Sequence, residues 1–538
     1  MSTINVGEGF SFPKKFWESD YQELFPPELI KLLKNLHERL NPERLRLLEA
    51  RKVRQGHYDK GEVPEFLDRN SEAVKGSWKV APIPRELLCR RVEITGPVNS
   101  AKMVINMLSR NEKGERADMA MLDFEDSMKP SFQNVLDGYK NVILAVPGRL
   151  TYFTEEKKYQ LNPNDMAYVM VRCRGLHLNE SNIKINGEEI SAGLLDLAVC
   201  FFHTARQYRL QNKTPKYYVP KCEHYLEARW WNNLFVELER ATKFPIGTLR
   251  ATFLIETLPA TFQVEEILYE LRDHAVGLNV GRWDKIFSDI KVLRNHPERI
   301  MADRSSINME RSWMENYAKR VIKICHSRGA FAMGGMSAFT PGKSPELRLE
   351  QTQKVSADKR REAQWGHDGC WVSHPYFIGV AMTAFKNENQ LKETLPDFDK
   401  YSDILPRSEG PHTMNGLRTN VRVGIAYMHG WMKDIGCVAF DNLMEDLATL
   451  EISRAQTWQW LHHQITLDDG VQVTKGLVAS VFADEFQKIL EEMKAETSEN
   501  RHRELFVELE EARDMALRVF TQDELSDFLT TTSEPVEF

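Results

Sequence analysis

The chain contains 538 residues, of which 42% are hydrophobic and 28% charged, which is the balance of a folded globular protein and excludes a disordered one. Its 71 basic and 78 acidic side chains give a net charge of −7 with no basic stretch, so the sequence indicates no nucleic-acid partner. Because a single core stops growing at roughly 250–300 residues, we expect two or three domains.

The sequence carries no signal for export or membrane insertion. Its N-terminus lacks an apolar run after a basic start, and the most apolar stretch, residues 194–202, is short and contains Asp196. The seven cysteines lie singly, as expected of reduced thiols, and the final residues Pro535 to Phe538 differ from the S-K-L peroxisomal signal. We therefore expect a cytoplasmic protein with no membrane partner, and the sequence predicts no particular oligomeric state.

Residues 1–90 are predicted to form an N-terminal helical segment. The clearest helical pattern covers residues 27–40, where apolar side chains recur at intervals of three and four: Leu29, Ile30, Leu32, Leu33, Leu36 and Leu40. Such a stripe indicates a helix with one buried face.

Residues 91–389 alternate short apolar runs with helix-length amphipathic stretches, which is the pattern of a parallel sheet with crossover helices. The runs cover residues 91–95, 119–124, 167–173, 217–222, 251–256, 276–280, 330–334 and 369–373. Eight such units favour an α/β fold of the closed (β/α)8 TIM-barrel type. The alternative, an open doubly wound sheet, is disfavoured because no G-x-G-x-x-G follows the first run and because charged residues follow several different strands.

Residues 390–538 are predicted to form a C-terminal helical domain, because the strand signal fades there. Periodic apolar residues and charge pairs indicate helices at residues 442–463, 478–497 and 503–520. On the first of these, Asp446 shares a face with Leu443, Leu447 and Leu450. A carboxylate on a buried face is a candidate general base, and the alternative is an acid in a first helical turn that interacts favourably with the helix dipole.

Three carboxylates crowd the end of the second apolar run, at Asp123, Glu125 and Asp126. Their repulsion raises the pKa of at least one of them unless a metal ion, an arginine or water relieves it. The sequence therefore suggests a cation site, and the alternative is an exposed acidic loop.

Two further carboxylates follow neighbouring runs, Glu256 at the end of the fifth and Asp284 just beyond the sixth. Adjacent barrel strands lie about 4.8 Å apart, so these groups can share one hard cation, and Mg²⁺ fits best because it takes one or two carboxylates and no His or Cys ligands. Arg172 ends the third run, where it could bind an anionic substrate or pair with the carboxylates. A metal and an arginine at one barrel mouth favour a small anionic substrate that carries a carboxylate and a carbonyl.

The segment DHAVGLNVGRWDKIF at residues 273–287 resembles the signature segment of malate synthases. Further segments resemble the family in the same order along the chain: DFEDS at 123–127, VRCRGLH at 171–177, FLIET at 253–257, GCWVSHP at 369–375 and LMEDLAT at 443–449. The chain length is similar to that of the shorter A-type enzymes, which lack an extra inserted domain.

This resemblance implies an enzyme of the glyoxylate bypass that condenses acetyl-CoA with glyoxylate and water to give malate and CoA. Its cofactor would be Mg²⁺, bound by Glu256 and Asp284, while Glu125 and Asp126 would hold the waters of the metal. Its partners would be the small molecules glyoxylate and acetyl-CoA. Closure of the C-terminal domain over the barrel mouth would complete the site.

The resemblance also implies the roles of individual residues. Asp446 would remove a proton from the acetyl methyl group, and Arg172 would stabilise both the resulting enolate and glyoxylate. The other implied substrate contacts are Gly281, Arg282, Trp283 and Asp284 for the glyoxylate carboxylate, Trp371 as a pocket wall, and Ser127 and Ser373 beside acetyl-CoA. The competing interpretations are a malyl-CoA-type lyase of the same barrel class, which the C-terminal domain disfavours, and an inactive scaffold.

Overall fold

The structure is a computed structural model that describes residues 2–531; Met1 and residues 532–538, and with them the C-terminal Pro535 to Phe538, lie outside the described part. The chain forms two compact units. The barrel unit contains the chain up to Arg54, Glu65–Gly281 and Ala318–Tyr401, and the helical unit contains Gln55–Pro64, Arg282–Tyr317 and the chain from Ser402 onward. None of the helices within residues 2–531 has the length and apolar character needed to cross a membrane.

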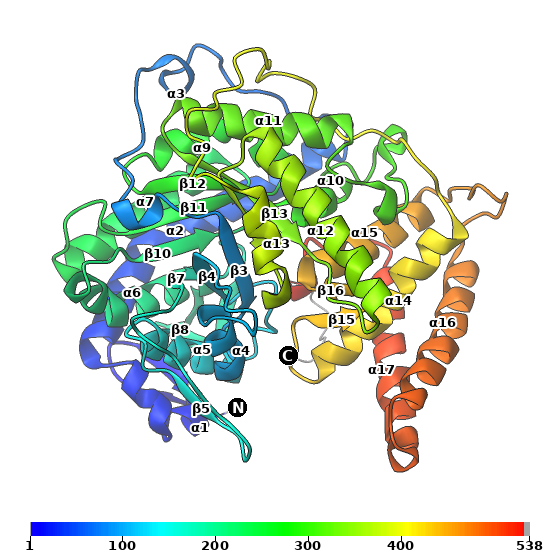
Figure 1. Cartoon of the computed structure of the whole chain (residues 1–538), viewed down its shortest axis with the longest axis horizontal. Coiled ribbons are helices and arrows are strands. Elements are labelled where there is room, and N and C mark those ends of the chain that lie inside the picture. The colour runs from blue at the N-terminus through cyan, green and yellow to red at the C-terminus, as the bar shows by residue number, and fades with distance from the viewer. Residues whose placement is uncertain (1, 532–538) are drawn as a thin grey trace. The chain divides into compact units, whose positions relative to one another are not determined.

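The barrel unit is built around a closed barrel of parallel strands, which confirms the predicted fold (Figure 1). In order around the barrel the strands are β3 (Val92–Pro97), β4 (Met119–Asp123), β7 (Tyr168–Arg172), β10 (Lys216–Val219), β11 (Arg250–Ile255), β12 (Ala275–Val280), β13 (Phe331–Ser337) and β14 (Gly369–Val372). Each corresponds to one of the eight predicted runs. The runs are mostly apolar because nearly every barrel-strand residue is buried, whichever way its side chain points.

Helices connect the strands and cover the barrel. Ser100, Ser131 and Ser191 begin three of them, each by accepting a hydrogen bond from a backbone N–H of the first turn. The helices of this part of the chain are α4 (Ala101–Leu108), α5 (Phe132–Ala145), α6 (Ala192–Leu210), α7 (Tyr225–Thr242), α8 (Leu258–Thr261), α9 (Val264–Glu270), α11 (Ser312–Ser327), α12 (Pro345–Trp365) and α13 (Ile378–Ala384).

The N-terminal segment is helical as predicted, but it also contributes strands that its sequence pattern did not indicate. The strands β1 (Thr3–Asn5) and β2 (Phe10–Pro13) join β8 (Asn179–Ile185) and β9 (Glu188–Ser191) in one sheet, and β5 (Thr151–Phe153) pairs with β6 (Lys158–Gln160) in a hairpin. The pairing of β2 with β8 is a contact between distant parts of the sequence, which local periodicity does not reveal. Two short helices, α1 (Lys14–Trp17) and α3 (Glu72–Lys75), complete the segment.

Helix α2 (Pro27–Tyr58) extends well beyond the predicted stripe, and two buried arginines fix it to loops that follow barrel strands. Arg44 donates to the carbonyl of Leu176 at 2.7 Å, in the loop after β7. Arg51 donates to Glu227 at 2.8 and 2.6 Å and to the carbonyl of Lys221 at 2.7 Å, in the loop after β10. The N-terminal helix therefore braces the loops on the side of the barrel where the predicted site residues lie.

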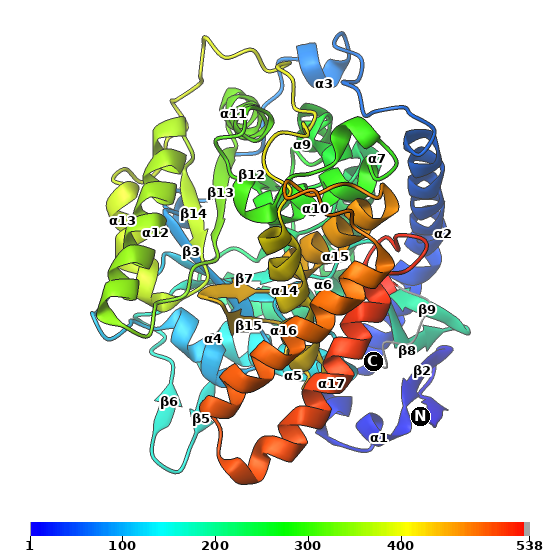
Figure 2. The same cartoon turned by 90° about the vertical axis from the view of Figure 1, so that its right-hand side faces the viewer.

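The helical unit packs α14 (Met414–Met432) against α15 (Leu447–His462), α16 (Lys475–Ala495) and α17 (His502–Phe520), and α15 also packs against α10 (Arg282–Val292) (Figure 2). The predicted helix at residues 442–463 begins later than expected. Leu443 belongs to strand β16 (Leu443–Glu445), which pairs with β15 (Val438–Phe440), so the face it was predicted to share with Asp446 does not exist. Asp446 is instead the N-cap of α15.

A buried histidine predicts how stability depends on pH. His367 is 1% exposed, and burial lowers its pKa to about 4, against roughly 6.5 in an unfolded chain. Between these values the unfolded chain binds more protons, so this residue removes on the order of 3 kcal/mol of stability as the pH falls from 6.5 to 4. We expect His367→Gln to lose this portion of the pH dependence in urea unfolding at pH 7 and pH 4.5. His57→Gln, the same change at an exposed position, is the matched control.

Candidate active site

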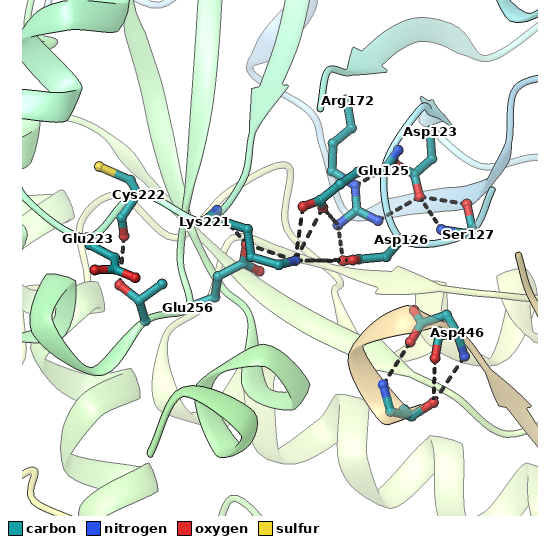
Figure 3. A network of polar contacts seen from close by, with 12 residues as sticks. Asp123, Glu125, Asp126, Ser127, Arg172, Lys221, Cys222, Glu223, Glu256 and Asp446 are labelled. Carbon is teal, nitrogen blue, oxygen red and sulfur yellow. Dashed lines mark hydrogen bonds and ion pairs between the residues drawn. The ribbon is translucent and has the colours of Figure 1, made fainter. Parts of the chain in front are cut away.

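Asp123 and Arg172 form the centre of the site, because the register of β4 and β7 places them directly beside each other. The Arg172 guanidinium donates two parallel hydrogen bonds to the Asp123 carboxylate, at 2.7 and 2.6 Å, and both residues are buried. Asp123 also accepts hydrogen bonds from the N–H of Glu125 and from the N–H and hydroxyl of Ser127. The guanidinium is therefore fixed in one plane (Figure 3).

Glu125 and Asp126 face the remaining end of the same guanidinium. Arg172 Nη1 lies 3.3 Å from Asp126 Oδ2 and 3.6 Å from Glu125 Oε2. Burial, and then the charge of Asp126, raises the pKa of Glu125 well above its ordinary value. Burial opposes ionisation of Asp126 as well, but Lys221 and Arg172 hold the pKa of that carboxyl below its usual range. The cluster is thus a buried network of charges, and the alternative of an exposed acidic loop is wrong.

Lys221 is a member of this network that the sequence analysis missed. Its ammonium lies 2.9 Å from Asp126 Oδ2 and 3.2 Å from Glu125 Oε1, and its backbone N–H donates to Glu256 Oε1 at 2.8 Å. Lys221 lies inside the predicted fourth run, residues 217–222, so the available signal was a charged residue near the C-terminal end of an apolar run, as for the predicted site residues. A lysine is ordinarily exposed, so this one was not singled out.

Glu256 follows β11, is fully buried, and offers one oxygen that a metal ion could take. While Oε1 accepts the Lys221 N–H, Oε2 has no hydrogen-bond partner within residues 2–531. A Cβ on Gly281 would lie 2.7 Å from this same oxygen, so the glycine leaves the space in front of it clear. A buried carboxylate oxygen without a hydrogen-bond donor fits a ligand of Mg²⁺, which binds through one or two carboxylates.

Trp371 and Ser373 lie at the end of β14. The Trp371 indole donates to Glu93 Oε2 at 2.9 Å, and its ring centroid lies 5.6 Å from the Arg172 guanidinium carbon. Ser373 donates to the carbonyl of Ser337 at 3.2 Å. Trp371 is therefore tied into the barrel interior next to Arg172.

In the helical unit, Arg282, Trp283 and Asp284 form the first turn of α10. The Arg282 guanidinium lies 5.0 Å from the centroid of the Trp283 ring, and both side chains are half-buried, whereas Asp284 is buried. Because α10 packs against α15, the two helices that carry Asp284 and Asp446 belong to one packed body.

Asp446 is held at the start of α15 by a reciprocal pair of hydrogen bonds (Figure 3). Its carboxylate accepts from the Thr449 N–H at 3.2 Å, and its own N–H donates to the Thr449 hydroxyl at 3.0 Å. The preceding Glu445 is paired with Arg304 at 2.7 Å, and Arg304 also donates to Ser453 at 2.7 Å in the second turn of the helix. Asp446 therefore interacts with the start of a helix, as the alternative interpretation expected. Its carboxylate is also buried, as predicted.

The predicted residues thus gather in two groups. The barrel unit brings together Glu125, Asp126, Ser127, Arg172 and Glu256, and the helical unit holds Asp284 and Asp446 on packed helices. Within residues 2–531, no set of three or more His, Cys, Asp or Glu side chains is grouped as a metal site.

Family models of malate synthases match most of the chain. The model described as "Malate synthase, N-terminal domain" matches residues 17–72, "Malate synthase, TIM barrel domain" matches residues 168–403, and "Malate synthase, C-terminal" matches residues 411–534. The last match includes Asp446.

Two relatives that are each 42% identical to this chain agree with these matches. Malate synthase A of Escherichia coli is 42% identical over 530 residues, covering 97% of this chain and 96% of the relative. The malate synthase of Myxococcus xanthus is 42% identical over 524 residues, covering 96% and 94%. A solved ternary complex of Haloferax volcanii malate synthase with pyruvate and acetyl-CoA has a TM-score of 0.48 at 14% identity, covering 79% of this chain and 97% of that one. The chain therefore belongs to the malate synthase family, as an A-type enzyme that makes malate from acetyl-CoA and glyoxylate.

Proposed function

We propose that the two groups of residues carry out this condensation with a divalent magnesium ion. Glu256 and Asp284 would bind Mg²⁺, and Glu125 and Asp126 would hold its waters. The ion, when bound, would polarise the aldehyde carbonyl of glyoxylate. The observation that supports this assignment is the unpartnered Oε2 of Glu256, joined through Lys221 to the carboxylates beside Arg172.

Asp446 is the proposed base that takes a proton from the methyl group of acetyl-CoA. Negative charge then develops on the thioester oxygen, and Arg172 offsets it with the N–H groups that Asp123 does not occupy. Because Asp123 fixes the guanidinium plane before substrate arrives, these donors need little reorganisation as charge develops. Hydrolysis of the malyl-CoA thioester would then release CoA and malate.

The remaining contacts concern the two substrates. The backbone of Gly281, Arg282, Trp283 and Asp284 would receive the glyoxylate carboxylate, as N–H groups at a helix start commonly do. Trp371 would form a wall of the pocket, and Ser127 and Ser373 would lie near acetyl-CoA. The Ser127 hydroxyl already donates to Asp123, which gives it a supporting role for Arg172 as well.

The first experiment measures loss of the thioester and formation of malate with both substrates, with each alone, and after removal of Mg²⁺. Thioester absorbance is preferable to a thiol reagent, because the half-exposed cysteines Cys89 and Cys437 form no disulfide and such a reagent can modify them. We expect malate to form only with both substrates and Mg²⁺. Accumulation of malyl-CoA without CoA release would instead indicate a lyase, and a folded enzyme that releases no malate would refute the assignment.

A further inference from the structure

Lys221 has a backbone conformation that is costly for a lysine. Its φ is +55°, in the left-handed region that non-glycine residues rarely adopt, although the residue is only 3% exposed. Hydrogen bonds fix its peptide groups on both sides: the N–H donates to Glu256, and the carbonyl accepts from Arg51 of α2. The chain is thus held in a strained turn that points the side chain into the carboxylate cluster.

The Lys221 ammonium meets three carboxylates at once (Figure 3). Its distances are 2.9 Å to Asp126 Oδ2, 3.2 Å to Glu125 Oε1 and 3.7 Å to Glu256 Oε1. Arg172 lies farther from the same cluster, with Nη1 3.3 Å from Asp126 Oδ2 and 3.6 Å from Glu125 Oε2, and its two hydrogen bonds go to Asp123. Lys221 is therefore the main fixed positive charge for the carboxylates proposed to hold the metal ion and its waters.

We propose that Lys221 is a charge-balancing residue of this reaction: it weakens the hold of the carboxylates on the divalent cation and thereby allows the anionic 2-oxo acid to bind beside them. Inside a protein, charges a few ångströms apart interact strongly, so the Lys221 ammonium repels a nearby Mg²⁺ and attracts a nearby carboxylate of the substrate. The ammonium thus opposes the cation and favours the anion. This inference rests on the proposed assignment of Glu256, Glu125 and Asp126 to the metal site.

The proposal predicts two shifts of opposite sign in Lys221→Met. Calorimetric titration of the metal-free enzyme with MgCl₂ should show binding about tenfold tighter than in the wild type, because a repelling charge is gone. At saturating Mg²⁺ the KM for glyoxylate should rise about tenfold, because the carboxylates now repel the anion more strongly. Lys221→Arg keeps the charge, so its Mg²⁺ affinity and its KM for glyoxylate should lie closer to the wild-type values than those of Lys221→Met.

Lys216 offers a matched control. It is a buried lysine at the opposite, N-terminal end of β10, paired with Glu86 at 3.1 Å, so Lys216→Met should change neither value. Damage to the fold would weaken the binding of both Mg²⁺ and glyoxylate. It cannot produce tighter Mg²⁺ binding together with a higher KM for glyoxylate. Should Lys221→Met fail to fold, Lys221→Gln also removes the charge. The same two measurements should then show tighter Mg²⁺ binding and a higher KM for glyoxylate.

Weaker or unchanged Mg²⁺ binding in the folded neutral variants would overturn the inference, as would an unchanged KM for glyoxylate. The wild type separates this failure from that of the proposed function. A wild-type enzyme that binds no Mg²⁺ refutes the metal assignment itself, whereas normal wild-type binding with no opposite shifts in the variants refutes only the role of Lys221.

Discussion

Replacing Asp446 by Asn is expected to lower the turnover number about 1000-fold, within the range that loss of a general base produces. The change tests chemistry apart from structure, because Asn and Asp are comparable N-caps. The amide oxygen of the introduced asparagine can still accept the Thr449 N–H, so the start of α15 should remain intact. What is lost is the capacity to take a proton from the acetyl methyl group. Initial rates with both substrates, and exchange of the methyl protons with deuterated water, measure this loss directly.

The matched control changes the other half of the same cap. Thr449→Val removes the hydroxyl that accepts the Asp446 N–H but leaves the carboxylate in place. It should cost about 1 kcal/mol in the free energy of unfolding and keep most of the turnover. If D446N exchanges methyl protons at the wild-type rate, the base is another residue. If both variants lose activity equally, the cap alone accounts for the effect.

The barrel was predictable from the sequence because its strands are buried on both sides. Residues 251–256 and 276–280 are mostly apolar, and Glu256 and Gly281 mark the positions where the strands end, so both the strands and their ends could be read. The pairing of β2 with β8 could not, since it joins residues more than 170 positions apart and leaves no local period.

The start of α15 shows how one pattern can conceal another. Leu443, Leu447 and Leu450 have helical spacing, which favoured a helix through Asp446. The structure ends a strand at Glu445 instead, because Asp446 and Thr449 cap each other and Arg304 holds Glu445. The capping signal, an Asp followed three residues later by a hydroxyl residue, was present in the sequence but weaker than the apolar period.

The residues that belong to the site were easier to predict from the sequence than the contacts between them. Each carboxylate and Arg172 could be found because it follows an apolar strand, but whether Arg172 was free or paired depended on register. The structure pairs it with Asp123 across β4 and β7. Lys221 escaped prediction because its importance arises from a strained turn and from three carboxylates that come from other strands.

Arg172→Lys is expected to lower kcat/KM about 100-fold, although the positive charge is kept. A guanidinium can hold Asp123 with two parallel bonds and still present N–H groups to the substrate, whereas an ammonium has no such fork. Losing one preorganised donor to a developing oxyanion typically costs about 100-fold or more. Steady-state kinetics with each substrate varied, together with urea unfolding, separates the catalytic effect from destabilisation.

Arg174 provides the comparison that decides how Arg172 acts. It is equally buried, two residues further along the same chain segment, and it makes an equivalent two-bond contact to Asp196 at 3.0 and 2.8 Å. Arg174→Lys should therefore destabilise the fold about as much as Arg172→Lys while changing kcat/KM by only a few-fold, because Arg174 has no proposed contact with substrate. Equal losses of activity in the two variants would mean that both arginines only support the barrel. A selective loss in R172K would mean that the guanidinium beside Asp123 acts on the reacting atoms.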